Sequence, residues 1–159
     1  MTQAYVGLGA NLGEPRRQVE AALSELDALP RTRLKKRSSL YRSAPVGYPG
    51  QPDYVNAVAE LETGLGPHEL LGALQEIELR HGRSRSFANA PRTLDLDILL
   101  FGDTVVSQAG LTIPHPRMHE RAFVLRPLLE VAPRAQIPGK GTAAELLGAC
   151  AGQSVERLP

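Results

Sequence analysis

Two carboxylates, Asp95 and Asp97, stand two residues apart in the apolar segment LDLDILLF at positions 94–101. The alternation predicts a strand, and residues two apart on a strand point to the same face, about 6.6 Å from each other along it. The even-numbered apolar residues, through Leu100, are expected on the opposite face. Two oxygen ligands that leave room for water and phosphate suit Mg²⁺ ions bound to a nucleotide. An ordinary strand with one solvated face is the alternative.

Four arginines and no acidic residue occupy the segment between Glu78 and this strand. The planar guanidinium group matches phosphate oxygens, so Arg83, Arg85 and Arg92 are candidates for phosphate binding. Arg80 is expected to interact with the C-terminal end of a preceding helix instead. Cations and carboxylates then meet at one edge of the sheet, where such a loop could close over a polyphosphate.

Tyr54 and Asn56 lie on the same face of another predicted strand. An aromatic ring and an amide presented together suit a flat heterocycle. Core packing for the tyrosine and turn formation for the asparagine are the ordinary alternatives.

His115 and His119 are four residues apart, a spacing used by zinc sites on helices. Prolines flank His115 on both sides and no Cys or acidic ligand joins the pair, so zinc binding is disfavoured. His115 is a candidate for contact with phosphate.

Two further patterns resemble nucleotide or nucleic-acid motifs only superficially. Gly7, Gly9 and Gly13 follow a strand, but the third glycine is one residue too late for a dinucleotide fingerprint, so they are interpreted as turn and packing residues. Six cations and no acid lie between Arg31 and Arg42. Three of these cations are consecutive and cannot share one face of a strand, which favours a charged edge strand over a nucleic-acid surface.

The order of the predicted elements is strand, helix, strand, strand, helix, strand. This order is typical of an α+β fold with a ferredoxin-like βαββαβ core. Prolines punctuate the remaining C-terminal part, where an extension of short strands and helices is expected, with helices near 118–129 and 142–150. The predicted core strands span 3–8, 33–42, 54–61 and 94–101, and the core helices span 15–30 and 66–82.

Composition limits the classes of function. The 159 residues suit one domain, 1–159, and the net charge of +1 gives no global attraction to nucleic acid or anionic lipid. One cysteine cannot form an internal disulfide, and no apolar run reaches the roughly 18 residues of a membrane span. A cytoplasmic protein is expected, with no nucleic-acid or membrane partner.

Four segments together resemble the 6-hydroxymethyl-7,8-dihydropterin pyrophosphokinase family of folate biosynthesis. They are GLGANLG at 7–13, QPDYVNAV at 51–58, PRTLDLDILLFG at 91–102 and PHPRMHERAFVLRPLLEVAP at 114–133. The resemblance covers nearly the whole chain in order and implies the ferredoxin-like fold. It also implies transfer of the β,γ-diphosphate of ATP to the hydroxymethyl group of the pterin, with release of AMP, by a monomer.

Matching positions carry the family's site residues. The resemblance implies that Asp95 and Asp97 bind two Mg²⁺ ions and are catalytic together with Arg83 and Arg92. The positions that match ATP contacts are Gln75, Glu78, Arg83, Arg85, Arg92, Ile98, Thr112, His115 and Arg121. The positions that match pterin contacts are Ser43, Ala44, Pro45, Val46, Gly47, Tyr54, Asn56, Asp95 and Phe123, with Tyr54 and Phe123 on the two faces of the ring.

Two other classes of protein compete with this interpretation. A nucleotidyltransferase with two metal ions on a similar sheet would release pyrophosphate instead of AMP. A ferredoxin-like RNA-binding module would need paired strand aromatics, which this sequence lacks.

Overall fold

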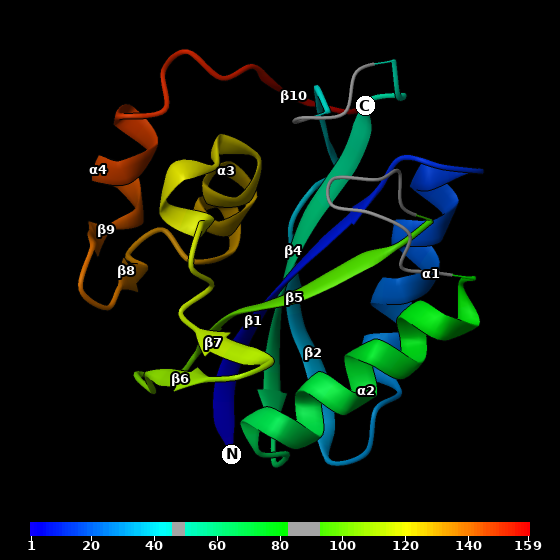
Figure 1. Ribbon diagram of the computed structural model, residues 1–159, viewed down its shortest axis with the longest axis vertical. Coiled ribbons are helices and arrows are strands. Elements are labelled where there is room, and N and C mark those ends of the chain that lie inside the picture. The colour runs from blue at the N-terminus through cyan, green and yellow to red at the C-terminus, as the bar shows by residue number, and fades with distance from the viewer. Residues whose placement is uncertain (46–49, 83–92) are drawn as a thin grey trace.

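The computed structural model describes residues 1–45, 50–82 and 93–159. Helices pack on both sides of a central sheet, and the two termini lie at opposite ends of the view in Figure 1. The elements in chain order are β1 (Thr2–Ala10), α1 (Pro15–Asp27), β2 (Thr32–Arg37), β3 (Tyr41–Ser43), β4 (Tyr54–Thr63), α2 (Pro67–Arg80), β5 (Asp95–Phe101), β6 (Val106–Gln108), β7 (Leu111–Ile113), the 3₁₀ helix η1 (Met118–Glu120), α3 (Ala122–Val131), β8 (Gln136–Ile137), β9 (Gly141–Thr142), α4 (Ala143–Gly148) and β10 (Val155–Arg157).

The sheet has the strand order β10-β3-β4-β1-β5, and β2 also pairs with β4. Strand β1 lies between β4 and β5 and is antiparallel to both. Helices α1 and α2 lie on the same side of the sheet (Figure 1). The α+β architecture with a ferredoxin-like βαββαβ core, predicted from the order of elements, is confirmed.

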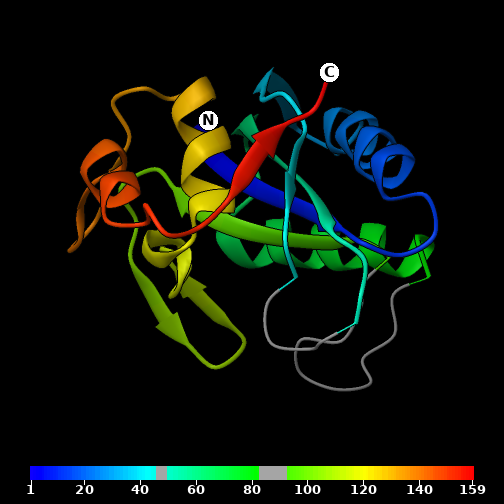
Figure 2. The same cartoon turned by 90° about the horizontal axis from the view of Figure 1, so that it is seen from above.

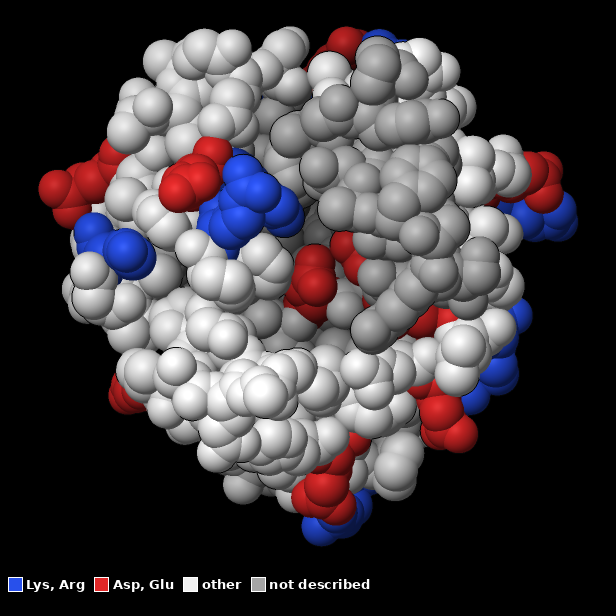
Figure 3. Space-filling model, in the orientation of Figure 1, with Lys and Arg blue, Asp and Glu red and all other residues white. Residues whose placement is uncertain are grey.

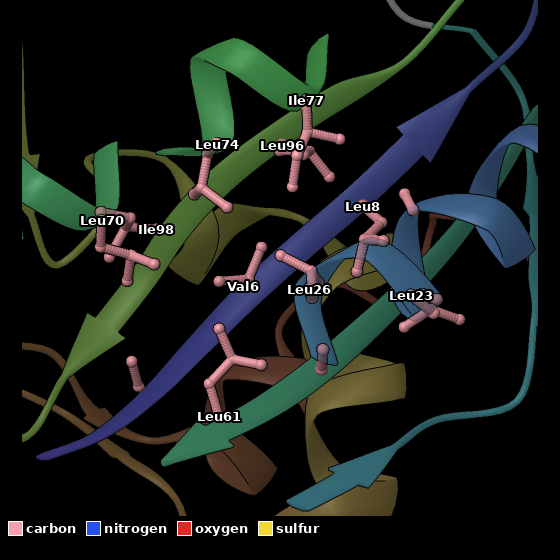
Figure 4. Close-up of a cluster of buried hydrophobic side chains, with 14 of the residues drawn as sticks. Val6, Leu8, Leu23, Leu26, Leu61, Leu70, Leu74, Ile77, Leu96 and Ile98 are labelled. Atoms are coloured by element: carbon pink, nitrogen blue, oxygen red, sulfur yellow. The ribbon is translucent and has the colours of Figure 1, made fainter. Parts of the chain in front are cut away.

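Helices α1 and α2 cover one face because each carries apolar residues at a spacing of three or four. Leu23 and Leu26 of α1 and Leu74 and Ile77 of α2 are at most 2% exposed. Figure 4 shows these side chains meeting those of the sheet, which are Val6, Leu8, Leu61, Leu96 and Ile98.

The ends of α2 follow from its sequence. Pro67 occupies the first turn, and Glu69 Oε1 accepts a hydrogen bond of 2.9 Å from the N–H of Gly66, which satisfies one of the free donors at the start of the helix. The helix ends at Arg80, and Gly82 follows with a φ of +80°, a conformation that glycine adopts at low cost.

Helix α3 covers the opposite face of the sheet, with α4 beyond it (Figure 1). Leu125 and Leu128 of α3 form a second apolar cluster with Val58 of β4 and Met118 of η1. Figure 2 shows β10 running alongside β3, with which it pairs. The C-terminal part of the chain therefore completes the sheet that the N-terminal part begins.

A bulge in β5 changes which residues face α3. Tyr5 of β1 lies opposite Leu100, whereas Val6 lies opposite Ile98, so Leu99 is an extra residue on β5. Leu100 consequently joins the cluster under α3, while Ile98 faces α1 and α2. The prediction that Leu100 shares a face with Ile98 is wrong for this reason.

The predicted strand 33–42 is two strands, β2 and β3, separated by residues 38–40. At Ser38, a side chain takes the place of a backbone acceptor on β4's neighbour. The Ser38 N–H donates to Val58 O, but the Val58 N–H donates to the Ser38 Oγ, both at 2.9 Å. Ser39 then bonds through its N–H and Oγ to the carboxylate of Glu130 in α3, both at 2.9 Å. Between the two strands, the chain passes from β2, which packs against α1, to β3, which packs against α3.

The basic segment predicted as an edge strand pairs with acidic residues of its neighbours. The nitrogen–oxygen distances are 3.3 Å for Arg31–Glu69, 3.4 Å for Arg33–Glu62, 3.9 Å for Lys35–Glu60 and 2.8 Å for Arg37–Glu20. Most of these side chains are exposed, so each pair stabilises the fold only weakly. Their effect is to neutralise the charge of this edge.

Candidate active site

A row of residues crosses the sheet on the face covered by α3. Gly9 of β1 lies opposite Asn56 of β4 on one side and opposite Asp95 of β5 on the other. Residues paired in this way share a face, so the carboxylate and the amide are both directed to this side. With neighbouring strands about 4.8 Å apart, Asp95 and Asn56 are separated by about 10 Å of sheet. Asp97 lies two residues further along β5, opposite Gly7.

Gly9 keeps the floor between the carboxylate and the amide open. A Cβ atom at this position would lie 3.3 Å from Asn56 Oδ1 and 3.7 Å from Tyr54 Cδ1. Gly7 differs, because the Leu99 side chain fills the space beside it. A Cβ atom at Gly7 would lie 3.3 Å from Leu99 Cδ2. Gly7 is thus a packing residue, as interpreted from the sequence, whereas Gly9 shapes the site.

The Asn56 amide is held by the neighbouring strand. Its Nδ2 donates to Ser43 Oγ at 2.7 Å, and the two residues are 4% and 6% exposed. The amide oxygen would be the atom nearest to a Cβ atom at Gly9. Of the residues predicted after Ser43, Ala44 is exposed and Pro45 is partly buried, and Val46 and Gly47 lie outside the described residues.

Asn11 joins the end of β1 to the segment that precedes Tyr54. This side chain is 1% exposed, and its Nδ2 donates to Gln51 Oε1 at 2.6 Å and to Pro52 O at 3.1 Å. The start of β4, which carries Tyr54, is therefore fixed relative to Gly9.

His115 stands beside Asp97. Its backbone N–H donates to the carbonyl of the bulged residue Leu99 at 3.0 Å, and its Nε2 lies 3.9 Å from Asp97 Oδ2. Nδ1 accepts a hydrogen bond of 3.1 Å from the N–H of Arg117, which leaves the ring proton on Nε2. Burial, assisted by the positive charge of Arg121, lowers the pKa of His115 to about 4. The ring is neutral at pH 7 and presents an N–H donor beside the carboxylate.

Arg121 and Phe123 flank the start of α3. The Arg121 guanidinium carbon is 5.4 Å from the centroid of the Phe123 ring, a cation–π distance. Burial and the charge of Arg117 lower the pKa of Arg121, and the negative charges of Asp97 and Asp95 oppose that shift. The cation therefore lies within electrostatic range of both carboxylates.

Figure 3 shows acidic side chains in a hollow on one face of the molecule, with basic side chains at its rim.

The other predicted ATP contacts come from elements around β5. Gln75 is exposed on α2, and Glu78 is buried with its Oε2 2.8 Å from the backbone N–H of Leu96. The Ile98 side chain is 5% exposed in the core, so its backbone is the part that can contact a ligand. Thr112 is exposed on β7. Arg83, Arg85 and Arg92 lie outside the described residues.

The donor set near β5 suits Mg²⁺ better than zinc. In residues 1–45, 50–82 and 93–159, no three His, Cys, Asp or Glu side chains are placed to hold a metal ion together. Mg²⁺ takes one or two carboxylates and fills its remaining positions with water and phosphate oxygens. The two histidines considered for zinc have different acidic neighbours. The Nε2 of His119 lies 3.5 Å from Glu120 Oε1, whereas that of His115 faces Asp97.

A sequence model of the family described as 7,8-dihydro-6-hydroxymethylpterin-pyrophosphokinase (HPPK) matches residues 5–133. The chain belongs to this family. A 2-amino-4-hydroxy-6-hydroxymethyldihydropteridine pyrophosphokinase of Pseudomonas aeruginosa is 51% identical over 157 residues, 99% of this chain and 97% of that protein. The enzyme of the same name from Haemophilus influenzae is 48% identical over 147 residues, 92% of each chain.

A solved structure of a triple mutant of Plasmodium falciparum HPPK-DHPS with pteroate shows a similar fold. Its TM-score is 0.73 at 14% identity, with 92% of this chain and 43% of that chain covered. This chain thus corresponds to less than half of the longer protein, and the similarity supports the pyrophosphokinase fold alone.

The neutral state of His115 predicts how stability depends on pH. A folded-state pKa near 4, below the ordinary value of 6.5, means that the unfolded chain binds a proton more readily between these limits. This contribution to stability is fully present above pH 6.5 and is lost as the pH falls towards 4. Urea titrations of the ligand-free protein should therefore show a smaller loss of stability in His115→Gln than in the wild type across this range. Parallel curves would contradict the assignment.

Proposed function

We propose that this chain transfers the β,γ-diphosphate of ATP to the hydroxymethyl group of 6-hydroxymethyl-7,8-dihydropterin, giving the pterin diphosphate and AMP. The observation that carries the proposal is the row in which Gly9 separates Asp95 from Asn56. The row sets the Asp95 carboxylate and the Asn56 amide on one face, about 10 Å apart. This spacing supports binding of a phosphate through Mg²⁺ at Asp95 and of a heterocycle at Asn56. A hydroxymethyl group on a ring bound at Asn56 would extend towards the carboxylates. The names of the relatives support the same reaction.

Asp95 and Asp97 are proposed to hold two Mg²⁺ ions together with the ATP phosphates. When bound, the ions would neutralise phosphate charge and fix the reacting phosphorus for in-line attack. His115 would donate its Nε2–H to a phosphate oxygen without adding charge. Arg121 would supply a positive charge near the same carboxylates. Arg83, Arg85 and Arg92 are proposed to bind the phosphate oxygens of ATP.

The pterin is proposed to lie over Gly9 with its edge against Asn56. The amide offers an oxygen that can accept from ring N–H groups, and Ser43 holds the amide in place. Tyr54 and Phe123 are the proposed aromatic contacts. The residues 44–47 are proposed to close the pocket beside Ser43.

The whole chain, 1–159, is proposed to act as one monomeric domain. The pairing of β10 with β3 supports the single domain, because it joins the C-terminal segment to the central sheet. No helix in the described part of the chain is long and apolar enough to cross a membrane. A cytoplasmic location is proposed from the cysteine content, since Cys150 is a buried free thiol and the only cysteine.

Product analysis tests the proposed reaction. The protein is incubated with ATP, Mg²⁺ and 6-hydroxymethyl-7,8-dihydropterin, and the nucleotides and phosphates are separated. AMP and the pterin diphosphate are expected in equal amounts. ADP would indicate transfer of a single phosphoryl group, and free pyrophosphate with a nucleotidylated pterin would indicate a nucleotidyltransferase.

Replacement of either metal-binding aspartate should affect activity far more than stability. Asp95→Ala and Asp97→Ala are each expected to lower turnover by about 100-fold or more, because each removes a group that fixes charge at the reacting phosphates. Both side chains are partly exposed, so unfolding free energies should change by only about 0.5 kcal/mol. Asp103→Ala, in the exposed turn after β5, is the matched control and should keep wild-type turnover. Near wild-type turnover in Asp95→Ala or Asp97→Ala would refute the metal assignment.

A methyl group at Gly9 should obstruct the pterin. Gly9→Ala would place a Cβ atom over the floor of the site, 3.3 Å from Asn56 Oδ1, and we expect pterin affinity to fall about tenfold. Gly72→Ala, on the exposed side of α2 with no atom within 4 Å of the new Cβ, should bind pterin normally. Equilibrium titrations with the pterin measure both. Equal affinity in the two variants would place the pterin elsewhere.

A further inference from the structure

Glu78, near the C-terminal end of α2, is buried against the outer edge of β5. It is 5% exposed, and its Oε2 accepts a hydrogen bond of 2.8 Å from the backbone N–H of Leu96. Leu96 stands between Asp95 and Asp97. A carboxylate from the neighbouring helix therefore holds the strand at the midpoint of the proposed metal-binding pair.

Strand β5 ends the main sheet and pairs there with β1. Alternate backbone groups of such a strand point away from the sheet and need partners from other elements. The Leu96 N–H meets this need through α2 and not through another strand. This bond is shielded from water, where a hydrogen bond is electrostatically stronger than at the surface, so the Glu78 side-chain oxygen fixes this point firmly.

Apolar packing alone would not fix the strand in this way. Ile77, the residue before Glu78, belongs to the same apolar cluster as Leu96 (Figure 4). Such packing keeps α2 against β5 but has no preferred direction along the strand. The hydrogen bond from Leu96 to Glu78 is directional, so it restrains the position of the backbone that carries both aspartates.

We propose that Glu78 is a positioning residue, which fixes the backbone of β5 so that Asp95 and Asp97 keep the spacing at which they bind Mg²⁺ with ATP. The inference rests on the proposed function of the two aspartates. It also gives Glu78 a different task from the ATP contact that the resemblance implies, since Glu78 acts through Leu96.

Three variants test the proposal. Glu78→Ala removes the acceptor, Glu78→Gln keeps an acceptor oxygen without the charge, and Glu76→Ala removes an exposed carboxylate from the same helix. The first readout is amide hydrogen exchange at Leu96 by NMR, without metal or nucleotide. The second is the Mg²⁺ concentration that gives half-maximal turnover.

In Glu78→Ala, we expect Leu96 to exchange about tenfold faster and the half-maximal Mg²⁺ concentration to rise about tenfold. Glu78→Gln should stay within about twofold of the wild type in both readouts, and Glu76→Ala should match the wild type.

Unchanged exchange at Leu96 in Glu78→Ala would overturn the proposal, whatever happens to turnover. The proposal would also be overturned if Glu78→Gln kept Leu96 protected but needed as much Mg²⁺ as Glu78→Ala, because the charge would then act directly on the metal or nucleotide. A separate result would show that the metal assignment itself is wrong. In that case Asp95→Ala and Asp97→Ala would keep turnover, while Leu96 would still exchange faster in Glu78→Ala.

Discussion

The register of β1 between β4 and β5 is the constraint on which the site depends. Because Gly9 lies opposite both Asn56 and Asp95, a single residue sets the distance between the part of the site that suits a heterocycle and the part that suits phosphate. A shift of one residue on either side would turn the partner side chain to the other face of the sheet. The two apolar clusters oppose such a shift, since each face of the sheet is buried against helices.

The bulge at Leu99 extends this constraint beyond the sheet. It releases the Leu99 carbonyl to accept the N–H of His115, which brings the imidazole next to Asp97. It also turns Leu100 towards α3, whose first residues follow Arg121 and include Phe123. One irregularity in a strand thus links the carboxylates to the C-terminal part of the chain, which supplies the neutral donor and the cation.

Local patterns predicted much of this arrangement. Alternation placed Asp95 and Asp97 on one face, and the order of elements gave the ferredoxin-like core, because both depend on residues close in sequence. The exchange of faces at Leu100 depends on a bulge, and the break at Ser38 depends on side-chain bonds to β4 and to Glu130 in α3. Gly9 and Asn11 act through residues 40 or more positions away, so their roles follow only from strand register and tertiary contacts.

A crystal structure with Mn²⁺, a non-hydrolysable ATP analogue and 6-hydroxymethylpterin would show where the metal and the pterin bind, since anomalous scattering locates Mn²⁺ without ambiguity. We expect Mn²⁺ coordinated by the carboxylates of both Asp95 and Asp97 and by phosphate oxygens. We also expect the pterin ring over Gly9 with its edge hydrogen-bonded to Asn56. Mn²⁺ bound away from the two aspartates, or a pterin that leaves Asn56 without contact, would show that these assignments are wrong.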